Sequence, residues 1–371
     1  MERRRLLHIL PAAPALLGAG CAARKKTNGA LGIEQVSSAV VFRGYRNSVT
    51  VDATPDRLSE MFKTPDDVMK WGIFNHVSFA SGTDDFREPG SQARIIMTVG
   101  GVVWNILFTN IRHTISGDGT HEIWFVGTNP TVHVQKWTFA PQGDGSKVTL
   151  RFYGEPPSFW GLRKIDWTDV VDVFINLFDT ALMNLANLFA PSFDRKAHLA
   201  SGGSGDIFDV IFQRFAAEFP VSAPAGKAYH YLSQNDRFST LLGDGSDVDC
   251  LSAKDSENCP FKVKVSGRSI GFDSFLVKRR PGMGQTRILT WDDYITSVEL
   301  SASPRFPFSS RARAVYTMEL PEQRSELAVD LTIGISRIPD KMAAAALSAK
   351  RELETGPLGS SVRPVQSIFT R

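Results

Sequence analysis

Histidine is the residue type whose spacing in this chain most suggests chemistry, because imidazole binds metals and transfers protons near neutral pH. Four histidines fall in the first half of the chain, namely His76, His113, His121 and His133. His113 and His121 flank the turn residues 117–119, so they are expected to lie near each other across a hairpin. No cysteine or neighbouring carboxylate completes a metal-ligand set. We therefore predict no metal and no cofactor, and we interpret these histidines as surface or cross-strand residues.

Motifs that mark common enzyme classes do not occur in the sequence. There is no G-x-S-x-G, H-E-x-x-H, P-loop or C-x-x-C pattern. The carboxylate pairs Asp66-Asp67 and Asp84-Asp85 lie in segments typical of helix starts or loops, where capping and solvation explain them. Gly100-Gly101 lies between two predicted strands and indicates a hairpin turn rather than a phosphate-binding loop. We therefore predict no catalytic residue.

The cysteines favour an exported protein. Cys250 and Cys259 bracket the polar segment 251–258, and two thiols so close in a loop suit a short disulfide in an oxidising compartment. Two free thiols are the alternative. A pair with this spacing and no further cysteine or histidine is a poor metal site.

The N-terminus has the pattern of a signal peptide. A basic start is followed by an apolar stretch at 6–20, about 15 residues long and too short for a membrane-spanning helix, which needs about 20. Small residues lead into Cys21, which resembles the lipobox of bacterial lipoproteins, although Leu17 stands one position earlier than the usual leucine. This resemblance implies cleavage after residue 20 and lipidation of Cys21. An ordinary secretory signal is the alternative.

The lipoprotein resemblance also implies a location in the cell. The chain would be anchored in the bacterial cell envelope and face the periplasm, and the second lipid chain that the family adds would make the anchor durable. Ala22 is not the aspartate that marks inner-membrane retention in some bacteria, which favours the outer membrane.

The segment up to about residue 190 has the pattern of one α+β domain. A polar tether is predicted at 21–37 and a long strand at 40–52, with a bulge near Gly44. Thr54 and Pro55 begin a helical stretch that Pro65 divides into two short helices. Five strands and one long helix follow, at 93–99, 102–111, 122–127, 132–140, 147–153 and 166–189.

The long helix at 166–189 is amphipathic. Its apolar face is broad, and a polar stripe lies opposite. That stripe contains Asp169, Asp172, Asn176, Asp179 and Asn187.

This order of elements resembles the START/Bet v 1-like (SRPBCC) superfamily of polyketide cyclase and lipid-transport type. The resemblance covers residues 38–190 and implies a helix-grip fold, in which a curved antiparallel sheet wraps around the long C-terminal helix. It also implies a cavity for a lipid or another apolar molecule, although core packing explains each residue equally well. The predicted pocket residues are Trp104, Ile106, Phe108, Phe125, Trp137, Phe174, Leu177, Phe178 and Leu185.

The same pattern starts again after a Gly/Ser-rich segment. Residues 210–215 lie without gaps over residues 40–45, at an offset of 170. Strands are predicted at 261–265, 269–278, 287–291, 312–320 and 326–335, with a shorter helix at 340–354. The chain is thus predicted to contain two tandem helix-grip domains. The boundaries are a signal peptide at 1–20, a tether at 21–37, domain 1 at 38–190, a linker at 191–206, domain 2 at 207–355 and a disordered tail at 356–371.

Charge excludes one class of function. The net charge is only +3, and Lys and Arg are scattered among acidic residues, so we predict no nucleic-acid partner. The preferred interpretation is a membrane-anchored envelope protein that binds or shuttles a hydrophobic small molecule or lipid. A non-catalytic interaction or assembly protein is the first alternative, and its protein partner is unknown. A cyclase- or dehydratase-type enzyme is the second, and it requires His113, His121 or His133 to point into the cavity.

Overall fold

The computed structural model describes most of the chain between residues 24 and 355. The described residues are 24–28, 32–81, 84–99, 102–128, 132–154, 167–190, 205–233, 261–265, 268–280, 284–291, 293–305, 309–319, 344, 347–348 and 350–355. The signal segment, Cys21, Cys250, Cys259 and the tail at 356–371 lie outside these residues, so lipidation and the disulfide stay predictions. No helix in the described residues is long and apolar enough to span a membrane.

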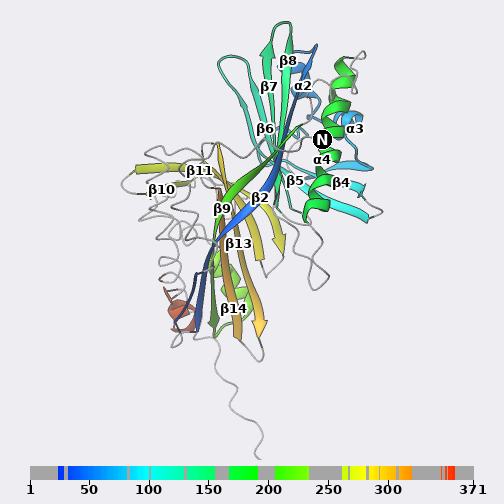
Figure 1. Cartoon of the computed structure of the whole chain (residues 1–371). Coiled ribbons are helices and arrows are strands. Elements are labelled where there is room, and N and C mark those ends of the chain that lie inside the picture. Colours follow the sequence, from blue (N-terminus) through cyan, green and yellow to red (C-terminus); the bar gives the residue numbers. More distant parts are fainter. Residues whose placement is uncertain are drawn as a thin grey trace, which may run out of the picture.

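All the described strands belong to one 14-stranded antiparallel sheet (Figure 1). Its order is β10-β11-β12-β13-β14-β9-β2-β8-β7-β6-β5-β4-β3, with β1 paired to β2. The strands are β1 (Arg24–Asn28), β2 (Ile33–Val51), β3 (His76–Ser81), β4 (Gln92–Val99), β5 (Val102–Ile115), β6 (His121–Gly127), β7 (His133–Gln142), β8 (Gly145–Gly154), β9 (Asp206–Val221), β10 (Phe261–Val265), β11 (Arg268–Arg280), β12 (Gly284–Trp291), β13 (Tyr294–Arg305) and β14 (Ser309–Glu319).

The sheet is continuous because the first strand of one half pairs with the first strand of the other. β2 and β9 run antiparallel from Glu34↔Glu218 to Arg46↔Asp206. In this register Val41 lies opposite Ile211, and these residues are equivalent under the sequence offset of 170. An approximate twofold axis through this pair therefore relates the two β strands. The predicted bulge near Gly44 is wrong, because β2 keeps its register there on both sides.

The first half is a helix-grip domain. Its strands follow the order β2-β8-β7-β6-β5-β4-β3, and α2 (Pro55–Glu60), α3 (Pro65–Trp71) and α4 (Trp167–Phe189) lie on one side of them (Figure 1). The two short helices begin as the sequence predicts. Thr54 and Thr64 accept hydrogen bonds from backbone amides of the first turn, and a proline follows each of them.

The second half repeats this arrangement in the residues that the structure describes. Its order is β9-β14-β13-β12-β11-β10, so β14 stands beside β9 as β8 stands beside β2. Helix α6 (Ala225–Leu232) and the helical residues 350–355 cover one face, where the buried Leu353 joins the core. The strand β13 was not predicted, and the predicted strand at 326–335 lies outside the described residues.

The predicted tether at 21–37 is wrong for the residues that the structure describes there. Residues 24–28 form β1, and β2 already begins at Ile33, which is buried in the core of the second domain. Composition suggested a tether because the segment is polar and contains glycine. Pairing with β1 and β9 supplies the hydrogen bonds that the local sequence does not reveal.

Helix α4 has the predicted bounds, but its polar stripe is only partly exposed. Asn176 and Asn187 face solvent, whereas Asp179 is only 8% exposed. Its carboxylate accepts hydrogen bonds from the hydroxyl of Tyr45, at 2.8 Å, and from the side-chain amide of Asn47, at 2.7 Å. Burial and this carboxylate both raise the pKa of Tyr45. The prediction that Asp179 lies on a solvated stripe is therefore wrong, and Asp179 fastens α4 to β2.

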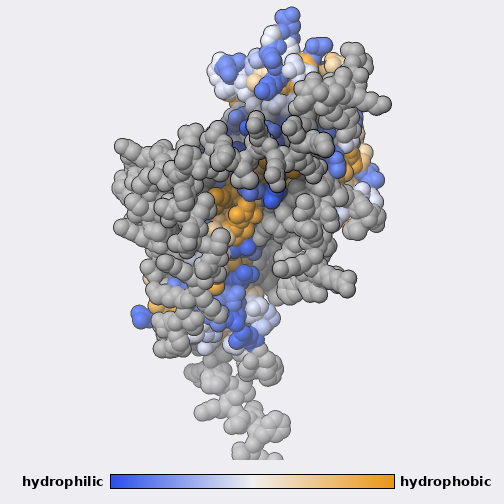
Figure 2. All heavy atoms as spheres, viewed as in Figure 1, coloured by the Kyte–Doolittle hydropathy of each residue, from blue (hydrophilic) through white to orange (hydrophobic). Residues whose placement is uncertain are grey.

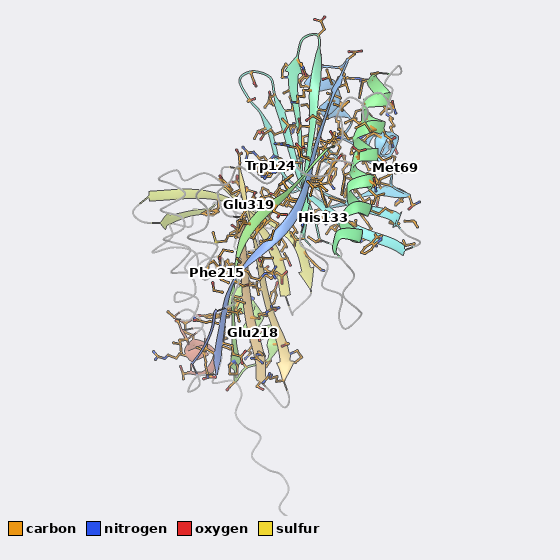
Figure 3. The ribbon with its side chains drawn as sticks, viewed as in Figure 1. Met69, Trp124, His133, Phe215, Glu218 and Glu319 are labelled. Atoms are coloured by element: carbon orange, nitrogen blue, oxygen red, sulfur yellow. The ribbon has the colours of Figure 1, made fainter. Side chains whose placement is uncertain are left out.

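The two halves of the sheet pack against each other through a third apolar core, which includes Phe42, Trp124, Tyr153, Phe212 and Ile288. The rings of Phe42 and Phe212 stack across the β2–β9 junction with centroids 4.1 Å apart. Figure 3 shows Trp124 and Glu319 at this waist of the molecule. Each half of the sheet has one face without helices, and these two faces pack against each other.

Charged groups are buried beside this third core. The Lys136 ammonium lies 3.9 Å from the centroid of the Trp124 ring and donates to the backbone oxygen of Asp293. Tyr153 donates a hydrogen bond of 2.9 Å to Glu319, which is 3% exposed. Burial lowers the pKa of Lys136 to about 8 and raises the pKa of Glu319, while attraction between the two charges opposes both shifts.

We expect Asp179→Ala to lower the free energy of unfolding by about 2–4 kcal/mol, because it leaves the Tyr45 and Asn47 donors buried without their acceptor. Tyr45→Phe removes only one of the two bonds and should cost about 1–2 kcal/mol. Urea unfolding measures both. The matched control is Asn176→Ala, an exposed position of the same helix, which should change stability by less than about 0.5 kcal/mol. Equal effects of Asp179→Ala and the control would contradict the fastening role.

Glu319 should make the protein less stable as pH rises. Since its pKa is raised in the folded state above the ordinary 4.5, the native state keeps a proton that the unfolded chain releases. The contribution of Glu319 to stability is therefore present below pH 4.5 and is lost as pH rises through the raised pKa. Glu319→Gln should remove this part of the decline in urea-unfolding series at several pH values. The exposed Glu299→Gln should leave the pH dependence unchanged, and identical curves for wild type and Glu319→Gln would contradict the assignment.

Candidate functional site

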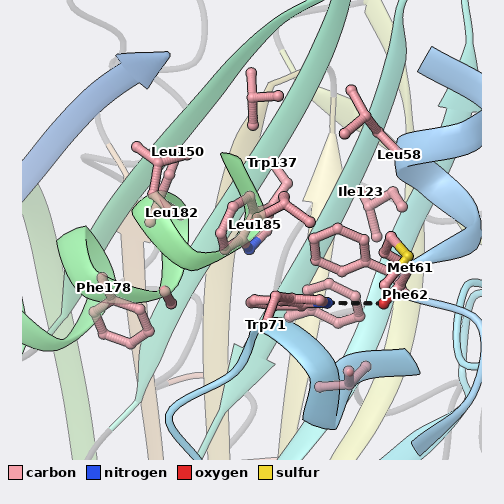
Figure 4. Packing of buried hydrophobic residues seen from close by; sticks show 14 of the residues in the cluster. Leu58, Met61, Phe62, Trp71, Ile123, Trp137, Leu150, Phe178, Leu182 and Leu185 are labelled. Atoms are coloured by element: carbon pink, nitrogen blue, oxygen red, sulfur yellow. Dashed lines mark hydrogen bonds between the residues drawn. The ribbon is translucent and has the colours of Figure 1, made fainter. Parts of the chain in front are cut away.

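The interior of the first domain is an aromatic cluster between the sheet and its helices. Phe62 lies at its centre, with ring centroids 4.7 Å from Trp71, 5.1 Å from Trp137 and 5.4 Å from Phe139. Figure 4 shows Phe62, Trp71 and Trp137 close together in this core, where the Trp71 indole donates a hydrogen bond of 2.9 Å to the backbone oxygen of Met61. Strand β7, helix α3 and the segment between the two short helices thus supply rings to a single core.

A small cavity remains inside this cluster, and we call it the aromatic cavity. Its volume is about 20 Å³, which is room for about one water molecule. Most of its wall is apolar. The lining residues are Phe62, Val68, Trp71, Phe74, Phe86, Ile95, Phe108, Phe125, Gln135 and Trp137.

The structure places the nine predicted pocket residues in different surroundings. Phe108, Phe125 and Trp137 line the aromatic cavity, and Ile106, Phe178 and Leu185 are buried elsewhere in the same core. Trp104 packs at the margin of this core, and Leu177 is half-buried. The side chain of Phe174 lies outside the described residues. The wall that α4 was predicted to provide comes instead from Phe62, which follows α2, and from α3 and the residues after it.

Gln135 is the polar residue of the cavity wall, and the sequence analysis did not single it out. It is 5% exposed and lies on β7 between two inward-facing residues, His133 and Trp137. The Trp137 indole donates to its side-chain oxygen at 3.3 Å. Because an indole N–H only donates, this contact fixes the orientation of the amide, with its NH₂ group at the other end. The available signal was a glutamine at an inward position of a strand. To recognise it, one must know which residues of the strand point inward.

His133 occupies a niche made by two glycines. The register places Gly127, His133 and Gly154 side by side on β6, β7 and β8. A Cβ at Gly127 would come within 2.1 Å of the imidazole Nε2, and a Cβ at Gly154 would come within 2.9 Å of the His133 Cβ. The ring packs between Phe108, at 5.2 Å, and Phe152, at 5.8 Å between centroids. Strand neighbours without side chains therefore let an imidazole lie flat in an apolar interior.

His113 and His121 come together, as predicted, with ring centroids 5.8 Å apart. Contrary to the expectation of no nearby carboxylate, His121 Nε2 lies 3.0 Å from Asp56 of α2. Burial lowers the pKa of His113, and the charges of Arg87 and His121 lower it further. Both rings face the side of the sheet that α2 covers, and neither lines the aromatic cavity. This pair joins α2 to the hairpin of β5 and β6.

Ion pairs hold the same helix from its other side. Arg87 contacts Asp85 at 2.6 Å and Glu60 of α2 at 2.7 Å. These contacts give the carboxylate of Asp85 a structural role, more specific than the predicted solvation. Asp67 caps its own helix through Thr64 and Lys70, which agrees with the capping interpretation. Within the part of the chain that the structure describes, no three His, Cys, Asp or Glu residues gather as a metal site.

The chemistry open to this interior is therefore mainly recognition. Its rings offer dispersion and apolar contact, and one amide and one imidazole offer hydrogen bonds. The geometric condition for an enzyme, an inward histidine, is met by His133, but this ring does not line the cavity. This wall can therefore offer apolar contact together with a few hydrogen bonds.

Several solved structures are similar to the chain at low identity. The di-domain ARO/CYC protein BexL from the BE-7585A biosynthetic pathway is 13% identical, with 86% of this chain and 99% of that chain covered and a TM-score of 0.31. A STAR-related lipid transfer protein from Xanthomonas axonopodis is 15% identical, with 45% and 98% covered and a TM-score of 0.31. The major latex-like protein 151 of Panax ginseng is 12% identical, with 42% and 99% covered and a TM-score of 0.30. No curated protein sequence matches the chain.

A family model matches the first half of the chain. Residues 44–189 match the family described as polyketide cyclase/dehydrase and lipid transport. The match begins within β2 and ends at the last residue of α4, so it covers the strands, helices and aromatic cavity of the first domain. Residues 44–189 of this chain are therefore similar to the polyketide cyclase/dehydrase and lipid transport family, in agreement with the START/Bet v 1-like resemblance of the sequence.

Proposed function

We propose that this chain is a lipid-anchored protein of the bacterial cell envelope that binds or shuttles a hydrophobic small molecule or lipid in its first domain. The observation that carries the proposal is the aromatic cavity, which lies inside a domain similar to the polyketide cyclase/dehydrase and lipid transport family. Aromatic and aliphatic side chains with a single polar residue form the kind of wall that holds apolar ligands. The second domain has a structural role, because its first strand completes the sheet beside β2.

A ligand larger than a water molecule must displace side chains of this wall. Phe74 is the candidate to move, because it is only partly buried and follows the C-terminus of the short helix α3. Trp71 and Phe62 are held more firmly, by a hydrogen bond and by several ring contacts respectively. Opening between α3 and the sheet would enlarge the cavity while the strands stay in place.

The membrane address rests on the sequence at Cys21. A single acyl chain gives only marginal membrane binding, so a lipoprotein-type anchor with two or more chains is what would hold the protein at the envelope. Retention on the periplasmic side of the outer membrane is the location that we propose.

A second candidate function is a non-catalytic interaction or assembly protein of the envelope. Two observations favour it. The cavity is small, and apolar residues are exposed on neighbouring strands at the junction, with Val41 50% and Ile207 52% exposed. Figure 2 shows hydrophobic surface near the middle of this face. Organic extraction of the purified protein discriminates between the two candidates.

The full chain carrying Cys21→Ser, purified from a bacterial envelope, should release one defined apolar molecule in near-stoichiometric amount. The substitution removes the protein's own anchor from the extract, and mass spectrometry identifies the released molecule. Adding Val68→Phe should abolish the release, because this residue lines the cavity and the larger ring fills it. Val103→Phe, the same change at an exposed position, should leave the release intact. An empty extract from well-folded protein would contradict the ligand-binding proposal and favour the assembly protein.

A comparison of the wild-type protein with Cys21→Ser tests the anchor. Wild-type protein should sediment with membranes and carry the added mass of the lipid chains on the peptide that begins at Cys21. Cys21→Ser should become soluble and lose this mass. Cys250→Ser is the matched control and should remain on the membrane. A wild-type protein that is soluble and carries no lipid would contradict the anchor.

A further inference from the structure

We infer that the ligand of the first domain carries a neutral hydrogen-bond acceptor, such as a ketone, ester or amide carbonyl, which the side-chain NH₂ of Gln135 binds. The inference rests on the proposed function, because it assumes that the aromatic cavity admits an apolar molecule. It adds the chemical class of that molecule and the residue that binds its polar group.

The amide of Gln135 is oriented by its neighbour. Trp137 is fully buried and stacks edge-on against Phe62 and Trp71, so its indole N–H is fixed in position. Its hydrogen bond of 3.3 Å to Gln135 Oε1 occupies the acceptor end of the amide. The donor end therefore remains for another group. Among the described residues, none accepts a hydrogen bond from Gln135 Nε2.

An amide in this position is costly without a partner. Gln135 is 5% exposed and lines a cavity whose other walls are aliphatic or aromatic. A buried donor that finds no acceptor loses the hydrogen bonds that it makes with water. A leucine or methionine would fill the same volume without this penalty. Gln135 thus brings an amide donor to the cavity wall, where a ligand atom would meet it.

The wall also indicates the charge of the ligand's polar group. The residues that line the cavity include no lysine, arginine or histidine. A carboxylate or phosphate would be desolvated there without a compensating cation, which strongly disfavours an anionic group. A carbonyl oxygen carries no charge and needs one or two donors. The amide NH₂ supplies them.

A matched pair of probes tests this inference directly. 2-Acetylnaphthalene has a ketone oxygen, whereas 2-ethylnaphthalene has nearly the same shape and no acceptor. Both are titrated into the full chain carrying Cys21→Ser, and quenching of tryptophan fluorescence reports binding because Trp71 and Trp137 line the cavity. We expect the ketone to bind about three- to tenfold more tightly, the range of one net hydrogen bond.

Variants then assign the preference to one side chain. Gln135→Met keeps the length of the side chain and removes the donor, so the two probes should bind equally well. Gln142→Met, at an exposed position of the same strand, should keep the preference of the wild type. Circular dichroism and thermal unfolding establish that each variant is folded before it is titrated.

The outcomes separate the inference from its premise. Equal binding of the two probes to the wild type, or a ketone preference that persists in Gln135→Met, overturns the role of Gln135 and leaves the proposed function standing. The wild-type comparison requires no variant, so it can overturn the role of Gln135 even if Gln135→Met folds poorly. Failure of both probes to bind the wild type overturns the inference together with the premise that the cavity admits an apolar molecule.

Discussion

The antiparallel pairing of β2 with β9 is the constraint on which the rest of the molecule depends. In a single helix-grip domain the first strand would be left with an unpaired edge, and such edges promote association with other chains. Here each first strand covers the edge of the other, over thirteen residue pairs centred near Val41 and Ile211. The pairing also brings the uncovered faces of the two half-sheets together, which creates the third core around Phe42 and Phe212.

In this arrangement both faces of the strands of the first domain are buried. Alternate side chains along each strand point to opposite faces. On β7, His133, Gln135 and Trp137 face the interior of the first domain, whereas Val134 and Lys136 face the second domain. One strand therefore supplies both the polar residues near the cavity and the cation at the waist. A change in its register would move every one of these side chains to the wrong core.

Glycine and hydrogen bonding make this double burial possible. Gly127 and Gly154 leave room for the imidazole of His133, and Trp137 orients the amide of Gln135. Asp179 is buried on α4 at the expense of solvation, and the donors of Tyr45 and Asn47 compensate for it. Polar groups near the cavity are thus held in place by specific neighbours.

Local sequence patterns were sufficient to predict the helices and strands that nearby residues define. Thr54-Pro55 marks the start of the first short helix and Pro65 the start of the second, and the amphipathic period of 166–189 predicts α4 within one residue of its bounds. The alternation of residues predicted most strands of the first domain, and the offset of 170 predicted the repeat. Patterns failed where pairing decides the structure. β1 and the start of β2 have weak strand signals and exist because β2 and β9 supply partners, and β13 follows a polar turn that hid it.

By itself, the sequence determined most strands and helices of the first domain through periodicity and length, and their order carried the resemblance that implied the fold class. The sequence also contained the aromatic residues of the cavity. It could not distinguish residues that line the cavity from residues that are only packed in the core, because both kinds are buried and apolar. Only the tertiary structure decided that Asp179 accepts a hydrogen bond from Tyr45, that Glu319 is buried near Lys136, and that Gln135 lines the cavity. Each of these depends on which residues from distant strands become neighbours, and on strand parity fixed by long-range register. A linear pattern does not contain that information.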